Sequence, residues 1–391
     1  MVVKKEVEIG GRLFSIETGK YAKQANGSVM VRYGDTMVLV TAVAASEAKE
    51  GLDYFPLQVE YREKTSAAGK FPGGYIKREG RPTEKEILSS RLCDRPIRPL
   101  FPESFTNETQ VVAMVMSYDG ENDADVLAAC GASAALAISD IPFDGPMAEV
   151  RIGRINGELI VNPTHEQIKL GDIELVVAGT ADSIMMVEGE SKEVSEQELL
   201  DALKFAQQEI KKIVDLQNQL RAEAGKTKWL VAEKTVDANL KKDVYDLAEA
   251  KYKEIVYSIL AKEERSAKNK ELSESVKKAL AEKFPEQEKV IGEILHDMEK
   301  DLMRERILKE GIRLDGRNTT QVRPITIELG NLPRTHGSAL FTRGETQSLT
   351  NVTLGTKDDE QTVDGLLAEY TKKFYLQYNF PPFSVGEVGR M

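Results

Sequence analysis

Basic side chains gather in one segment of a chain that is otherwise acidic. The segment covers residues 70–101 (KFPGGYIKREGRPTEKEILSSRLCDRPIRPLF), and from Lys70 to Arg98 it holds eight basic residues against four acidic ones. The whole chain has 391 residues and a formal net charge of −11. Lysine and arginine neutralise nearby phosphates whatever the net charge of a protein, because salt screens charges beyond roughly 10 Å. The segment is therefore the first candidate for a site that binds a polyanion.

The first half of this segment is predicted to be a loop. Residues 71–75 (FPGGY) contain a proline and two glycines, which a regular helix or a central strand does not accommodate. Tyr75, Lys77, Arg78 and Arg81 lie on the loop or directly after it. Because a tyrosine ring can stack on a base while cations contact phosphates, we expect these four residues to bind single-stranded nucleic acid.

A helix is predicted to begin after the loop, at residues 82–84 (PTE). Arg91, Arg95 and Arg98 follow at spacings of four and three, so they would share one helix face. A proline in the last turn makes that shared face approximate. Two interpretations stay open, since the arginines either line a nucleic-acid path or pair with Asp94 and nearby glutamates in a structural ion-pair network. The two glycines of the loop favour binding, because a purely structural helix start does not need them.

Residue patterns from the start of the chain return about 310 positions later in the same order. Four short matches with small changes of offset do not arise together by chance, so an internal repeat is predicted. The matching pairs are residues 15–19 (SIETG) with 326–330 (TIELG), 27–28 with 337–338 (both GS), 34–36 (GDT) with 344–346 (GET), and 55–58 (FPLQ) with 374–377 (FYLQ). In each copy apolar and polar residues alternate around the GDT or GET turn, which predicts a β-hairpin at 28–43 and another at 338–354.

The repeat and the composition divide the chain into three predicted domains. Residues 1–225 would form an α+β domain that ends in an amphipathic helix at 196–220. Residues 226–310 are highly charged, with apolar residues at helical spacing, and predict an all-α domain whose charges serve solubility and i, i+4 pairing. Residues 311–391 begin a second copy of the first domain. Because this copy stops before the elements that would bury its sheet, we expect a protein that continues beyond Met391.

Composition excludes several other classes of protein. The longest uncharged apolar run, residues 126–138, is shorter than the roughly 18 residues of a membrane span and predicts a buried helix. The N-terminus, MVVKKEVEIGG, lacks the apolar core of a signal peptide. Cys93 and Cys130 are too few for a disulfide framework or a zinc cluster, and we expect packed thiols. None of the three histidines has a nucleophile or metal-ligand spacing, and His336 is predicted to be a turn hydrogen-bonder. These features predict a cytoplasmic protein with no membrane partner.

Four long motifs make the chain similar to a known family. FPGGYIKREGRP, RLCDRPIRPLFP, LPRTHGSALFTRGETQ and YNFPPFSVGE, in two repeats around a helical insert, resemble bacterial polynucleotide phosphorylases over essentially the whole chain. The resemblance implies an α+β fold with two RNase PH-like domains that flank an all-helical domain. It also implies a homotrimer that shortens single-stranded RNA from its 3′ end to nucleoside diphosphates, or polymerises RNA in reverse. Its cofactors would be inorganic phosphate and Mg²⁺ or Mn²⁺, and its further partner an RNA-degrading assembly with an endoribonuclease or a helicase.

The same resemblance implies that the catalytic residues lie beyond Met391. In the family, a Gly-Ser-Ser-Ser run and a later L-G-D-x-D-x-K-V-A-G segment of the second repeat carry the phosphate and metal chemistry. The matching part of the first repeat, residues 122–125 (NDAD), has two acids that would repel phosphate. Residues 170–179 (LGDIELVVAG) have Glu174 in place of an aspartate and Val176 in place of the lysine. The first repeat is thus expected to guide RNA, with no catalytic residue and no metal ligand of its own.

The loop that begins at residues 71–75 and the basic residues after it do match a loop of the family. There the matching loop lines a central RNA aperture and usually presents two aromatic residues and two arginines. Ile76 and Lys77 depart from that pattern, which weakens stacking and bidentate phosphate recognition. By the same resemblance, the loop also includes Tyr75, Arg78 and Arg81. Three further RNA-binding candidates match the family's basic helix near the RNA path: Arg91, Arg95 and Arg98. The alternative function is a non-catalytic RNA-binding or scaffold module.

Overall fold

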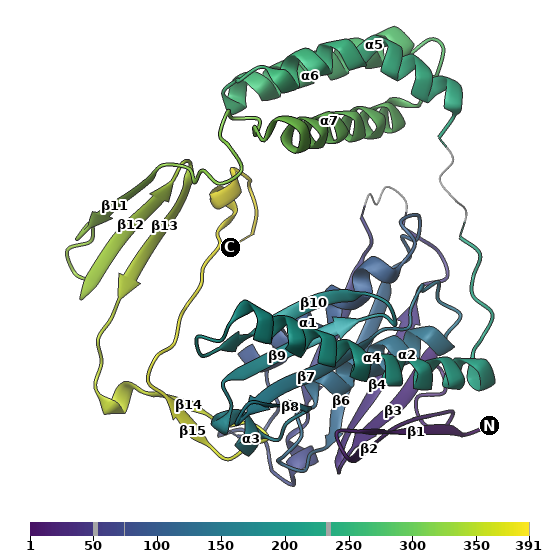
Figure 1. The fold of residues 1–391 in the computed structure, drawn as a ribbon, viewed down its shortest axis with the longest axis vertical. Coiled ribbons are helices and arrows are strands. Elements are labelled where there is room, and N and C mark those ends of the chain that lie inside the picture. Colours follow the sequence, from purple (N-terminus) through teal and green to yellow (C-terminus); the bar gives the residue numbers. More distant parts are fainter. Residues whose placement is uncertain (50–53, 74, 232–235, 391) are drawn as a thin grey trace. The chain divides into compact units, whose positions relative to one another are not determined.

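The computed structural model describes residues 1–49, 54–73, 75–231 and 236–390. Contacts group the chain into two units (Figure 1). One unit consists of Met1–Glu233 with Glu360–Met391, and the other of Lys234–Asp359. Each unit has an apolar core of its own.

A six-stranded sheet forms the first part of the first unit. In sheet order its strands are β1 (Val3–Ile9), β2 (Arg12–Thr18), β3 (Gly27–Tyr33), β4 (Thr36–Ala44), β6 (Thr109–Ser117) and β5 (Leu57–Glu63). Neighbouring strands are antiparallel except β5 and β6, which are parallel. The parallel pair needs a long crossover, and the basic segment at residues 70–101 lies on it.

A four-stranded antiparallel sheet forms the second layer of strands in this unit. Its order is β10 (Ile184–Ser191), β9 (Ile173–Gly179), β7 (Ala148–Ile155) and β8 (Glu158–Val161). Strand β7 is central and five of its eight residues are buried, yet it carries the charged residues Glu149, Arg151 and Arg154. A buried strand tolerates such residues only when partners compensate their charges.

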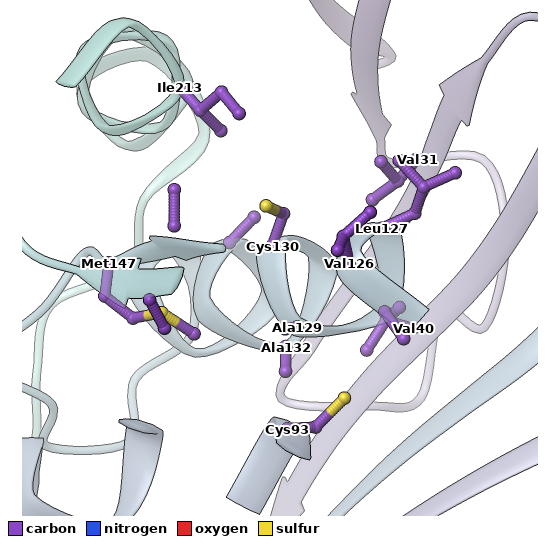
Figure 2. Packing of buried hydrophobic residues seen from close by; sticks show 14 of the residues in the cluster. Val31, Val40, Cys93, Val126, Leu127, Ala129, Cys130, Ala132, Met147 and Ile213 are labelled. Carbon is purple, nitrogen blue, oxygen red and sulfur yellow. The ribbon is translucent and has the colours of Figure 1, made fainter. Parts of the chain in front are cut away.

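Helix α2 (Asp125–Ile138) is the centre of the core of the first unit. All of its residues are buried, and it packs against both sheets and against α1 (Glu84–Ile97) and α4 (Glu196–Ala224) (Figure 2). A Cβ atom at Gly131 would lie 2.5 Å from Val40 Cγ2 and 2.9 Å from Val31 Cγ2, so only glycine allows this approach. The buried helix predicted at residues 126–138 is confirmed.

Two further helices complete the first unit. Helix α4 begins with a capping box at Ser195 and covers β1 and the second sheet. It extends to Ala224, so the amphipathic helix predicted at residues 196–220 is confirmed with one more turn. The short α3 (His165–Leu170) precedes β9. In the parts of the chain that the structure describes, no helix is long and apolar enough to cross a membrane.

The second unit contains three helices and a small sheet. The helices α5 (Ala238–Tyr257), α6 (Lys262–Leu280) and α7 (Glu288–Glu310) bury apolar residues at helical spacing against one another. The all-helical insert predicted from the sequence is therefore confirmed over its described residues. The sheet has the order β11 (Ile325–Leu329), β12 (Gly337–Arg343) and β13 (Thr346–Val352), and every pair is antiparallel.

The two predicted hairpins have the same local structure. Strands β3 and β4 meet through the pair Tyr33–Thr36, and β12 and β13 meet through Arg343–Thr346. The turn glycines Gly34 and Gly344 have φ angles of 61° and 63°. Side chains with a Cβ rarely adopt this left-handed conformation, which explains why both copies keep glycine before the acid. Both hairpins and the internal repeat are thus confirmed.

A last hairpin returns to the first unit. It consists of β14 (Gln361–Val363) and β15 (Tyr370–Lys372), joined by residues 364–369. Four 3₁₀ turns occur at η1 (Thr65–Ala68), η2 (Arg98–Leu100), η3 (Lys357–Asp359) and η4 (Pro382–Val385).

Candidate nucleic-acid interface

Residues 71–82, which we call the basic loop, present their side chains to solvent. The loop contains Gly74, which lies outside the described residues. Tyr75 is fully exposed, and Lys77, Arg78 and Arg81 are exposed as well. Within the described chain, these four residues make no hydrogen bond, ion pair or ring contact. Their charges and the tyrosine ring are therefore free to meet a ligand.

The end of the basic loop is held by the start of α1. Thr83 accepts a hydrogen bond from the backbone N–H of Glu86, and Glu86 Oε2 accepts one from the backbone N–H of Thr83 at 2.7 Å. Glu86 Oε1 also accepts from the backbone N–H of Glu63 on β5, at 2.8 Å. Within the loop, Glu79 pairs with Lys64 at 2.6 Å. The helix start predicted at residues 82–84 is confirmed, and the capping box and the hydrogen bond to β5 hold it in place.

The three arginines predicted to share one helix face differ in their partners, and only Arg91 and Arg95 lie on α1, whereas Arg98 begins the 3₁₀ turn η2. Arg98 donates two hydrogen bonds of 2.6 Å to the Asp94 carboxylate, which raise its pKa, and it also reaches two backbone carbonyls. Arg95 pairs with Glu188 on β10. Arg91 has no partner among the described residues. These contacts favour a structural ion-pair role for Arg95 and Arg98. Arg91, like the cations of the basic loop, stays available for a ligand.

A second group of charged residues lies in the interior of the first unit, around the Arg151 side chain. The Arg151 guanidinium lies 2.6 Å from Asp125 and from Glu174, and 3.4 Å from Asp123. We call these four residues the Arg151 cluster. Burial by itself lowers the pKa of Arg151, but the three carboxylates raise it above its ordinary value. Burial and the nearby Asp125 charge raise the pKa of Asp123.

The cluster joins two segments that are far apart in the sequence. Residues 122–125 and 170–179 converge there, and Arg151 occupies the point of convergence. The cavity beside Arg151 has a volume of about 10 Å³, enough for roughly one water molecule and too small for a phosphate. Acids gathered around a guanidinium repel a phosphate, and they do not offer a divalent cation an open set of ligands because their oxygens already pair with Arg151.

Glu149, two residues before Arg151, is also buried in this region. Neither of its carboxyl oxygens has a hydrogen-bond partner in the described structure. Burial, reinforced by the Asp125 charge, raises the pKa of Glu149 well above its ordinary value. Burial without a hydrogen-bond partner thus favours the neutral form of Glu149 over the ionised one.

Arg154 forms an ion pair with Asp172, the second acid of residues 170–179. It contacts both carboxylate oxygens of Asp172, at 2.9 and 2.7 Å, and Glu198 of α4 at 2.5 Å. Over the described residues, no group of three histidine, cysteine or acidic side chains could hold a metal ion. Sequence reasoning missed both β7 arginines. The sequence did contain an indication of their role, because arginines in a largely apolar strand need acidic partners to compensate their charge.

The packed thiols and the hydrogen-bonding role of His336 are confirmed. Both thiols are buried: burial raises the pKa of Cys93 well above its ordinary value and that of Cys130 to about 12. His336 accepts a hydrogen bond of 2.8 Å from the backbone N–H of Leu354, as a turn residue. His165 lies 2.7 Å from the hydroxyl of Tyr118. Neither thiol is a nucleophile in this environment.

Three family models match the chain. A model described as 3′ exoribonuclease family, domain 1, matches twice, at residues 10–142 and 321–391. Together these two matches cover more than half of the chain and coincide with the two repeats. The chain belongs to the 3′ exoribonuclease family. Domain 2 of this family matches residues 145–209, and residues 239–318 match a model described as polyribonucleotide nucleotidyltransferase, RNA binding domain.

Curated relatives agree with this assignment. The polyribonucleotide nucleotidyltransferase of Chlorobaculum parvum is 53% identical over 409 residues, which cover all of this chain and 56% of the relative. That of Geobacter sulfurreducens is 53% identical over 384 residues, covering 98% of this chain and 55% of the relative. The chain thus spans about half the length of the curated relatives it matches. The predicted resemblance and the α+β fold with a helical region between the repeats are confirmed.

Among solved structures, the distant likeness to rice (Oryza sativa) Rrp46 has a TM-score of 0.43 and 15% identity over 53% of this chain and 93% of that one.

Proposed function

We propose that this chain takes part in the phosphate-dependent degradation of single-stranded RNA from the 3′ end. In that reaction an oxygen of inorganic phosphate attacks the last phosphodiester, the 3′ oxygen of the preceding nucleotide leaves, and a nucleoside diphosphate is released. The reverse reaction extends RNA. Membership of the 3′ exoribonuclease family and the name shared by the relatives support the proposal.

Within this reaction we assign RNA guidance, and not catalysis, to residues 1–391. The observation that carries this assignment is the Arg151 cluster, whose acids already form ion pairs with a guanidinium from their own chain. Phosphate and a divalent ion, Mg²⁺ or Mn²⁺, would therefore act at residues outside this chain. The basic loop supplies four exposed side chains of the types that bind a single strand: cations for phosphates and an aromatic ring for a base.

The rest of the organisation follows from the same proposal. The chain would divide into a first RNase PH-like domain at residues 1–225, an all-α domain at 226–310 and the start of a second RNase PH-like domain at 311–391. The helical region matches a model described as RNA binding, which adds an RNA contact that its charge pattern did not indicate. We further propose a cytoplasmic homotrimer that joins an RNA-degrading assembly with an endoribonuclease or a helicase.

The test is a phosphorolysis assay on the 391-residue chain. Supplied with poly(A), phosphate and Mg²⁺, the pure chain is expected to bind the RNA but to release no ADP above background. Phosphate-dependent ADP release that Asp172→Asn abolishes would show that the first repeat is itself an active site. A longer protein encoded by the same gene serves as the positive control and is expected to release ADP.

The alternative, a non-catalytic RNA-binding or scaffold module, differs in one outcome. If the longer protein also binds poly(A) without releasing ADP, the whole protein is a binding module. That result would overturn the proposed exoribonuclease activity and leave RNA binding by the basic loop in place.

A further inference from the structure

One residue of the second repeat is buried in the core of the first unit. Leu366, at the tip of the β14–β15 hairpin, is 6% exposed and belongs to the core cluster that α2 centres. Among the described residues of 311–390 no other side chain is buried. A single buried leucine on an otherwise exposed segment marks a specific contact, since burial of its apolar side chain stabilises the docked hairpin.

The backbone around Leu366 is bound by a lysine at the foot of the basic loop. Lys70 Nζ donates to the carbonyl of Gly365 at 2.9 Å and also to the carbonyl of Leu367. Gly73 is close to the same hairpin, because a Cβ atom there would lie 2.7 Å from Asp364 Oδ2. The hairpin tip thus lies against the start of the loop at Lys70 and at Gly73.

The hairpin also reaches the other end of the loop. Lys372, at the end of β15, lies 3.4 Å from Glu84, the first residue of α1. Between Lys70 and Glu84 stand the exposed side chains of the basic loop, together with three glycines at positions 73, 74 and 80. A glycine-rich segment of this length is conformationally free unless its ends are held, and ordering it on RNA binding would reduce affinity.

We propose that residues 364–367 of the second repeat are a latch that positions the basic loop for single-stranded RNA. The proposal rests on the RNA-guiding function assigned to that loop above. Leu366 anchors the latch in the core, and Lys70 joins it to the start of the loop. Both are positioning residues, because the RNA contacts come from the loop itself. The latch makes RNA binding by the first repeat depend on a short segment of the second.

Limited trypsin digestion without RNA tests whether the latch holds the basic loop in place. Leu366→Asp and Lys70→Met are expected to raise the rate of cleavage after Lys77 and Arg78 about tenfold, because a released loop fits the protease better. Lys70→Arg keeps the donors, and Leu376→Asp changes an exposed residue outside the latch, so both are expected to behave as wild type. Cleavage after the buried Arg151, read by mass spectrometry, reports global unfolding and is expected to stay constant.

Affinity for a fluorescent oligo(A) tests the functional part. The two latch variants are expected to bind about tenfold more weakly with an unchanged salt dependence, because the phosphate contacts survive but the loop must first be ordered. Loop cleavage at the wild-type rate in both variants would overturn the latch. Faster cleavage with unchanged affinity would instead overturn the RNA role of the loop, and with it the positioning role of the latch.

Discussion

The Arg151 cluster and the basic loop use the same kinds of side chain in opposite ways. In the cluster, an arginine on a central strand is buried and neutralised by three acids that come from two distant segments. In the loop, two arginines and a lysine stand in solvent with no partner among the described residues. Buried charges must be compensated within the protein, whereas exposed ones stay available for a ligand. The comparison separates arginines that hold the fold from arginines that can bind RNA.

The comparison is tested most strongly by removing one arginine from each region. Arg151→Met leaves the buried Asp125 and the partly buried Asp123 and Glu174 without this cation, and is expected to lower the free energy of unfolding by about 3–5 kcal/mol. The matched change Arg78→Met is expected to alter it by less than about 0.5 kcal/mol, because Arg78 is exposed. Urea unfolding followed by fluorescence of Trp229, the single tryptophan, which packs near Phe105 in the first unit, measures both. Equal losses in the two variants would contradict the contrast.

Replacing Lys77, Arg78 and Arg81 together by alanine examines the loop as a phosphate-binding surface. Each lost phosphate contact removes about 0.7 from the slope of log K against log salt, so the triple variant is expected to lose about 2 from the slope and about 100-fold in affinity at 0.1 M salt. A control variant carries alanine at three exposed lysines of α3 and α4: Lys169, Lys204 and Lys211. A lower melting temperature with an unchanged salt slope would identify the loop cations as a structural ion-pair network.

Tyr75→Ala asks whether the loop also recognises bases. Loss of one stacking ring is expected to weaken single-stranded RNA binding by about 1–3 kcal/mol with little change in the salt slope. Tyr75→Phe keeps the ring and is expected to bind as wild type. Fluorescence anisotropy over a salt series measures both quantities. An alanine variant that binds as tightly as wild type would leave the loop with phosphate contacts alone.

Glu149→Gln concerns the acid of the buried region that lacks a partner. The folded state keeps the Glu149 proton at pH values above the ordinary pKa of 4.5, where the unfolded chain has lost it. Unfolding then releases a proton, so this group lowers stability as the pH rises, by up to about 1.4 kcal/mol per pH unit. The glutamine variant is expected to lose that part of the slope as the pH rises above 4.5 in urea unfolding.

Glu190→Gln is the control for this last comparison, because Glu190 lies exposed on β10 and the change removes the same charge. Identical pH slopes in wild type and Glu149→Gln would mean that the folded protein holds an ionised Glu149. The cluster region would then carry one more negative charge than the contacts of Arg151 account for.

Several features of this protein were predictable because short segments determine them. The Gly34 and Gly344 turns, the buried helix at α2, the long amphipathic α4 and the capped start of α1 all follow from patterns within a few residues. The repeat and the exposed charge of the basic loop are likewise legible in the sequence. Local backbone preferences and the periodicity of apolar residues carry this information, and neither needs a distant partner.

Other features depended on contacts that only the tertiary structure supplies. The pairing of Arg95 with Glu188 joins residues 93 positions apart. Arg151 contacts Asp125, which precedes it in the sequence, and Glu174, which follows it. The contact of Lys70 with the hairpin tip spans 295 positions. The sequence by itself therefore determined the family, the elements and which side chains are charged. The tertiary structure decided which of those charges are already neutralised, because burial and Coulomb attraction depend on distances that the order of residues does not specify.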